Sequence, residues 1–184
     1  MQGSIYTAFS DMIIEKMGMV QWNELIEETE PASKGIYTSA ERYQDSELIN
    51  MVIALSVKTG ISAETLIEQF GQYLFKKLYA TCPVEVSSID NLKSFLLAID
   101  ELIHVEVKRI HPKAYLPTFE YDQPDEQTLI MYYHSKRKLC HASVGLIYGA
   151  AEQFNETIEI EHPECMHHGA GRCKLIVHFK GHNE

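Results

Sequence analysis

The chain has no long apolar segment and little positive charge, and each shortage excludes a class of protein. No stretch approaches the run of about 18 apolar residues that a membrane-spanning helix needs. Only 16 Lys and Arg accompany 26 Asp and Glu, which gives a formal net charge of −10. Such a surface does not neutralise phosphates, so we expect no nucleic acid and no membrane among the partners.

Cysteine is also scarce, and the chain begins without the basic segment and uninterrupted apolar stretch of a secretory signal. We therefore expect a cytoplasmic protein whose four cysteines are reduced thiols or metal ligands. The apolar fraction of 45% and the length of 184 residues suit one globular domain.

Hydrophobic periodicity predicts helices in the first part of the chain and strands in the last part. The expected helices cover residues 4–17, 22–28, 45–58, 62–79, 91–109 and 141–154, with a loop over 29–44. Ser62 is expected to cap the fourth helix. The expected strands cover residues 113–121, 127–134, 157–161 and 174–179, and the residues DQPDE form a turn within the first pair.

This order of elements predicts an α+β fold with a roughly four-stranded antiparallel sheet. No flexible linker separates independent units, so we expect a single domain over residues 1–184. Within it, a helical front subdomain covers about residues 1–60, and a mixed subdomain covers about residues 61–184.

His104 lies deep in the predicted helix 91–109, among apolar neighbours. A neutral imidazole in this setting can be a proximal ligand of heme iron. From the helix alone, a satisfied core histidine is the more ordinary interpretation, because the chain has nine histidines and none has a diagnostic spacing.

The segment Tyr133-His-Ser135-Lys-Arg137 offers two hydroxyl groups and a guanidinium at alternate positions. On an extended chain these side chains share one face. Such a trio suits paired carboxylates, because arginine binds them through two parallel hydrogen bonds. The alternative is an ordinary solvated strand face.

The combination of an in-helix histidine, a proline thirteen residues later (Pro117) and this Tyr-x-Ser-x-Arg motif resembles the H-NOX family, the bacterial relatives of the heme domain of soluble guanylate cyclase. The resemblance covers essentially the whole chain, and YHSKRKLCHASVGLIYG matches the family in its motif and following helix. It implies a b-type heme with His104 as axial ligand to the iron.

The resemblance also implies roles for the residues around this heme. Tyr133, Ser135 and Arg137 would hold the propionates. Pro117 would press on the porphyrin together with Ile5, and Phe9 would line the distal pocket. Each of these last three has an alternative interpretation as ordinary packing.

Ala142 bears on the choice of gas. Oxygen-binding members of the family carry a distal tyrosine in the helix after the motif, and this chain has Ala142 five residues past Arg137. Bound O2 gains from a hydrogen-bond donor, whereas NO gains much less. We therefore expect binding of NO and CO and exclusion of O2, unless Tyr148 or another hydroxyl enters the pocket.

A second cluster of possible ligands surrounds the last helix and strands. Cys140, His162, Cys165 and Cys173 suit a tetrahedral zinc ion. His167 and His168 are alternative nitrogen ligands, and unrelated buried cysteines are the alternative to a site. Cys82 has no partner in sequence and is expected to be a free thiol.

Together these features predict a non-enzymatic, heme-based nitric oxide sensor. We expect it to signal in trans to a histidine kinase or a cyclic-di-GMP enzyme, with a redox response at the zinc and cysteines. One alternative is a heme-free, zinc-containing small-molecule-binding module of the vinyl-reductase type. Another is a heme enzyme such as a peroxidase, which would need distal acid–base groups that the front helices lack.

Overall fold

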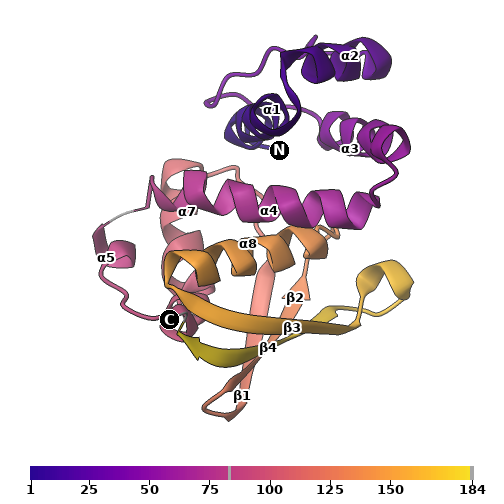
Figure 1. The fold of residues 1–184 in the computed structure, drawn as a ribbon. Helices are drawn as coiled ribbons and strands as arrows, with labels where there is room; N and C mark the ends of the chain where they lie inside the picture. The colour runs from indigo at the N-terminus through magenta and orange to yellow at the C-terminus, as the bar shows by residue number, and fades with distance from the viewer. Residues whose placement is uncertain (83, 183–184) are drawn as a thin grey trace.

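The computed structural model describes residues 1–82 and 84–182. The front of the molecule consists of helices connected by short turns and one loop (Figure 1). These helices are α1 (Gly3–Met17), α2 (Met19–Thr29), α3 (Asp45–Thr59) and α4 (Ala63–Tyr79). Ser62 caps α4 as expected, since its hydroxyl accepts a hydrogen bond from the Thr65 amide at 3.2 Å.

The back of the molecule begins with short helical pieces and continues as a sheet with one crossing helix. The helical pieces are α5 (Val84–Ser87), α6 (Leu92–Leu97), a π-helical turn (Ile99–Ile103) and α7 (His104–Ile110). They are followed by β1 (Thr118–Asp125), β2 (Thr128–His134), α8 (Cys140–Gln153), β3 (Glu156–Glu164), a 3-10 turn (Met166–His168) and β4 (Cys173–His182).

The four strands form one antiparallel sheet in the order β1-β2-β4-β3. Helix α8 lies between this sheet and α4, and α1 to α3 lie beyond α4 (Figure 1). The predicted α+β fold with a four-stranded antiparallel sheet is confirmed. No helix in the described part of the chain is long and apolar enough to cross a membrane.

Helix α4 contributes to two hydrophobic cores, one among the front helices and one against the sheet. Its Leu66, Phe70 and Leu74 pack with α1 to α3, whereas Phe75 packs with α6, α8 and the sheet. The contact of α4 with α8 depends on glycine, because a Cβ atom at Gly145 would lie 1.9 Å from the Glu68 carbonyl oxygen. The two helix backbones therefore approach too closely for any side chain at this point.

The expected helix over residues 91–109 is present with nearly these bounds, but it is not a uniform α-helix. Asn91 caps α6, but the helix widens into the π turn at Ile99–Ile103 before regular geometry resumes at His104. A π turn accommodates one extra residue in a helix, and a hydrophobic pattern does not distinguish it from an α-helix.

The expected first strand, 113–121, is also displaced. Strand β1 starts only after Pro117 and continues to Asp125, so most of the expected turn DQPDE belongs to the strand. Pro124 is tolerated there because β1 is an edge strand with a register shift between Asp122 and Asp125.

We predict that Gly145→Ala lowers the free energy of unfolding by about 2–3 kcal/mol, because the new methyl group meets backbone rather than a movable side chain. Urea denaturation followed by circular dichroism measures the change. Gly171→Ala is the matched control, since a Cβ there has no neighbour within 4 Å. Equal stability of the two variants would contradict the close contact.

Candidate functional site: a buried histidine, a hydroxyl–guanidinium turn and a thiol cluster

His104 begins α7 directly after the π turn, and its side chain is only 15% exposed. Its Nδ1 lies 2.6 Å from Oδ1 of Asp100. Burial lowers the pKa of His104, and the negative charge of Asp100 opposes this shift without reversing it. The imidazole is therefore neutral at pH 7, as an iron ligand must be, and Nε2 is the nitrogen that remains for a metal.

The side chain of Phe119 connects the histidine to the Tyr-x-Ser-x-Arg segment. Its ring centre lies 6.2 Å from that of His104 and 5.6 Å from that of Tyr133. The amide of Phe119 donates to Oδ2 of Asp100 at 2.6 Å. Pro117 is half-buried two residues earlier, so the chain that enters β1 runs beside the histidine-bearing turn.

Tyr133, Ser135 and Arg137 come together through a turn and not on a strand face as expected. Strand β2 ends at His134, and the next residues turn back with a hydrogen bond from the Lys138 amide to the Ser135 carbonyl. Lys138 adopts a left-handed backbone with φ of 51°. The Ser135 hydroxyl accepts a hydrogen bond from the Arg137 amide at 3.2 Å, which explains why the strand does not continue.

The hydroxyl of Tyr133 is arranged to donate a hydrogen bond. It is buried, and it accepts one from the Leu139 amide at 3.0 Å. Burial raises the pKa of Tyr133 to about 12, so the phenol keeps its proton. Because its oxygen is already an acceptor, that proton is available to a carboxylate of a ligand.

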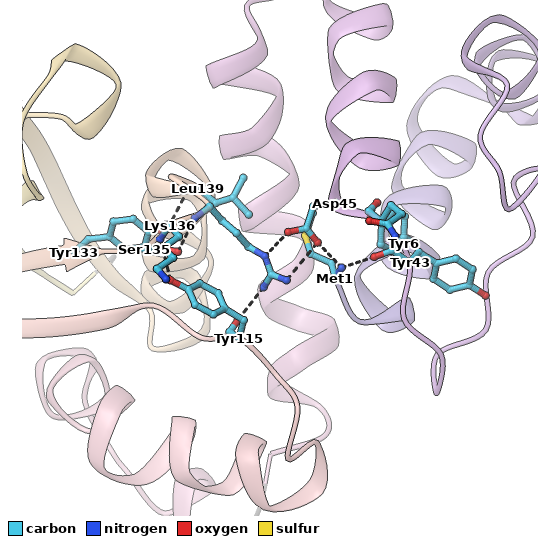
Figure 2. Close-up of polar contacts among 11 residues, drawn as sticks. Met1, Tyr6, Tyr43, Asp45, Tyr115, Tyr133, Ser135, Lys136 and Leu139 are labelled. Atoms are coloured by element: carbon cyan, nitrogen blue, oxygen red, sulfur yellow. Dashed lines mark hydrogen bonds and ion pairs between the residues drawn. The ribbon is translucent and has the colours of Figure 1, made fainter.

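Arg137 connects this turn to α3 through Asp45, which lies beside Met1 in Figure 2. Its guanidinium donates to both carboxylate oxygens of Asp45, at 2.5 and 3.3 Å, and to the Tyr115 carbonyl at 2.9 Å. Asp45 also pairs with the amino group of Met1, which donates in turn to the Tyr43 carbonyl at 2.6 Å. An open hollow of about 540 Å³ beside Arg137 is lined by Met1, Asp45 and the residues around Tyr43.

The remaining predicted pocket residues lie in or beside the front core. Phe9 is fully buried and its ring packs edge-on against Phe70 at 5.2 Å. Ile5 is half-buried against the same core, as are Leu139 and Leu146. Ala142 on α8 is half-buried. Tyr148 belongs to the core of the sheet, where it packs with Ile158 and Ile160.

The four predicted zinc ligands are brought together. The ligand atoms of Cys140, His162, Cys165 and Cys173 all lie within 4.8 Å of one another. The sulfurs of Cys140 and Cys165 are 3.7 Å apart, which is close to the separation of two sulfurs bound to one tetrahedral zinc at about 2.3 Å each. Nε2 of His162 is buried with no hydrogen-bond partner in the described residues.

The alternative nitrogen ligands stand outside this group. His167 is exposed, with its Nε2 2.7 Å from the Lys138 carbonyl oxygen, and His168 is exposed as well. Cys82 lies apart from the cluster as a half-buried thiol, and burial raises its pKa. Of these histidines, His162 is the one whose ring nitrogen lies with the three sulfurs in the described residues.

Comparison with known proteins decides the family. Residues 2–162 match HNOB, described as Haem-NO-binding. The chain belongs to this family. An H-NOX protein from S. oneidensis in the Fe(II) ligation state is 32% identical, with a TM-score of 0.92 over 100% of this chain and 98% of that one. An H-NOX protein from S. oneidensis in the Fe(II)NO ligation state gives 0.91, at 32% identity over 98% and 100% of the two chains.

Two further relatives show how widely the likeness extends. An Fe(II) unliganded H-NOX protein from K. algicida is 31% identical, with a TM-score of 0.89 over 100% of this chain and 97% of that one. Soluble guanylate cyclase gcy-35 of Caenorhabditis elegans is 25% identical over 162 residues, 85% of this chain. The chain spans only 23% of the length of that cyclase. The predicted family is confirmed: this is an H-NOX domain, of a heme-binding family of gas sensors.

The residues of this H-NOX chain fit a heme. A neutral histidine leaves Nε2 for iron, the half-buried apolar side chains of Ile5, Leu139 and Leu146 offer surface to a porphyrin, and Arg137 with two buried hydroxyls suits propionates.

Asp100, Phe119 and Asp45 were missed from sequence. Asp100 had a signal, its position four residues before His104; Asp45, 92 residues from Arg137, had none.

We predict that the ion pairs of Asp45 with the Met1 amino group and with Arg137 weaken in acid. Burial raises the pKa of Asp45, but hydrogen bonds from the Met1 amino group and Arg137 outweigh it and leave the pKa below its usual value. A carboxyl with a lowered pKa stabilises the fold above the unfolded pKa of about 3.9, and this contribution is lost as pH falls through the folded value.

Urea denaturation of the protein and of Asp45→Asn from pH 7 to 3 measures this contribution. The variant should be less stable at pH 7, by on the order of 1 kcal/mol, and the difference should shrink as the pH falls below about 3.9. Asp122→Asn, at an exposed carboxyl of β1, is the control. A pH-independent difference would contradict the assignment.

Proposed function

We propose that this H-NOX domain is a heme-based nitric oxide sensor with His104 as the iron ligand. The observation that carries the proposal is that the ring of Phe119 joins a buried, neutral His104 to the Tyr133–Arg137 turn, in a chain of the Haem-NO-binding family. The heme supplies an iron that binds diatomic gases. Tyr133, Ser135 and Arg137 would hold its propionates, and Pro117, Ile5 and Phe9 would line its pocket.

Selectivity for NO and CO over O2 is supported by the residues on the front side of the pocket. Phe9 and Ala142 carry no hydrogen-bond donor, and Tyr148 packs in the core of the sheet and not in the front core. Without a donor, bound O2 loses the stabilisation that distinguishes it from NO. The Fe(II)NO state of the S. oneidensis protein agrees with NO as the ligand.

Signal output is proposed to occur in trans, through movement of α1 to α3 against the rest of the molecule. Two polar contacts join these parts close to the site. Arg137 pairs with Asp45, and the Gln2 amide lies 3.1 Å from Nδ1 of His111, one residue beyond α7. A change at His104 is therefore transmitted along α7 to α1, and a histidine kinase or a cyclic-di-GMP enzyme would respond to the resulting shift between two states.

A zinc ion at Cys140, His162, Cys165 and Cys173 belongs to the same proposal. The sulfur separation and the unpartnered Nε2 of His162 support it. Zinc would hold the first turn of α8 against the β3–β4 connection. Oxidation of the thiols would release the metal and give a redox response.

A heme-free zinc module is the second candidate, and the thiol cluster favours it on its own. Such a module has no use for a neutral histidine beside a buried hydroxyl–guanidinium turn. The two candidates therefore differ in whether the protein binds heme.

We predict that the reduced protein binds one heme whose absorption band shifts with NO and with CO but not in air. His104→Gly should lose the band or require added imidazole for it, because the axial ligand is gone. His134→Gly, at an exposed histidine of the same chain, should behave like the parent. A stable oxy complex would contradict the gas selectivity, and absence of heme after reconstitution would favour the zinc module.

We predict one zinc per chain in protein purified under reducing conditions, measured by elemental analysis. Cys165→Ser should lower the zinc content at least tenfold, because a hydroxyl replaces a thiolate ligand. Cys82→Ser should leave it unchanged, since Cys82 lies outside the cluster. Equal zinc content in both variants would rule out this site.

A further inference from the structure

The carboxylate of Asp100 stands where the histidine-bearing helix meets strand β1. It lies in the π turn, and its side chain is 26% exposed. Oδ2 accepts the hydrogen bond from the Phe119 amide at 2.6 Å, and Oδ1 lies 2.6 Å from Nδ1 of His104. One carboxylate thus contacts both the ring of the proposed iron ligand and the backbone that enters β1.

Oδ1 of Asp100 lacks a hydrogen-bond donor among the described residues. It is buried and has no well-aligned hydrogen bond within the described residues, although Nδ1 of His104 lies 2.6 Å away. A buried carboxylate oxygen without a donor is unfavourable. An N–H on Nδ1 of His104 would supply that donor.

The charged and polar groups around this contact leave His104 as the best donor. Lys108 on α7 and Glu101 in the π turn are exposed. Another buried group without a hydrogen-bond partner among the described residues is the hydroxyl of Tyr121 on β1, and the charge of Asp100 acts on it. Tyr121 is therefore the one competitor that an experiment must separate from His104.

We propose that Asp100 is a positioning residue for the iron ligand. Its carboxylate accepts the Nδ1–H of His104, fixes the tautomer in which Nε2 is unprotonated, and increases the electron donation of the ring to iron. This role rests on the proposed function, because it requires His104 to bind heme. The hydrogen bond from Phe119 holds the carboxylate in place, so displacement of His104 also pulls on β1.

The first test compares Asp100→Asn with Glu101→Gln and Tyr121→Phe in the heme-loaded protein. Asparagine keeps an amide oxygen for the Phe119 N–H but removes the charge beside Nδ1. We expect the iron–histidine stretching frequency in resonance Raman spectra to fall, and the reduction equilibrium to favour the ferrous state at least tenfold more, a shift of about 59 mV. Both control variants should retain the parent values.

An unchanged stretching frequency in Asp100→Asn overturns the proposal. A shift of equal size in Tyr121→Phe also overturns it, because the effect would then belong to the hydroxyl. Circular dichroism of each variant reports whether the fold is retained.

The second test does not depend on the natural side chain at residue 104. In heme-loaded His104→Gly, added imidazole carries an N–H that Asp100 accepts, whereas 1-methylimidazole does not. We expect imidazole to bind at least tenfold more tightly, in the range by which partners of metal ligands change affinity, about 10–100-fold. In His104→Gly with Asp100→Asn, this preference should disappear.

Two results would overturn the role of Asp100 while leaving the sensor intact. One is equal binding of the two ligands by His104→Gly. The other is a preference that persists in the double variant, which would indicate steric exclusion of the methyl group. Failure of the parent chain to bind heme would instead overturn the proposed function, and this role with it.

Discussion

The close approach of α4 and α8 is the contact on which both halves of the molecule depend. Gly71 and Gly145 let the two backbones meet without side chains between them, and α4 contributes side chains to both cores. Because the two helices cannot separate or slide without breaking this fit, the start of α8 has a fixed position. The turn that carries Ser135 and Arg137 ends there, so helix packing far from the turn sets where the guanidinium lies.

Two packing requirements explain why the histidine-bearing segment is not a regular helix. Residues 92–110 must bury Leu92, Phe95 and Leu96 against α8 and the sheet and also present His104 beside Phe119. A uniform α-helix turns about 100° per residue and does not allow these two requirements to be adjusted separately. The π turn at Ile99–Ile103 changes the rotation between them, and it places Asp100 against both His104 and β1.

Sequence reasoning succeeded where residue type and local spacing carry the information. The order of helices and strands follows from hydrophobic period, and the ligand candidates follow from chemistry that few residues provide. It failed where the backbone departs from regular geometry. The face shared by Tyr133, Ser135 and Arg137 was inferred from an extended strand, whereas the side chains converge because the chain turns after His134.

Long-range contacts were beyond sequence reasoning for a different reason. The pairing of Arg137 with Asp45 joins residues 92 apart, and nothing in either local segment indicates the other. The choice of His162 over His167 likewise required the register of β3 on β4, because all the histidines near Cys165 are close to it in sequence. A single chain specifies such pairs only through the completed fold.

The two proposed sites share one short segment, and this has a mechanical consequence. Tyr133 lies opposite Cys173 in the β2–β4 ladder, and its hydroxyl is held by the amide of Leu139, the residue before Cys140. The turn between β2 and α8 has Lys138 in a left-handed conformation, which is uncommon for a residue other than glycine. The contacts at the two ends of the turn therefore have to stabilise this conformation. A metal at the thiols would fix one end, and a ligand on the guanidinium side would fix the other. Loss of either restraint would act on the same few residues, so the proposed gas binding and thiol oxidation would have a common structural target in this chain.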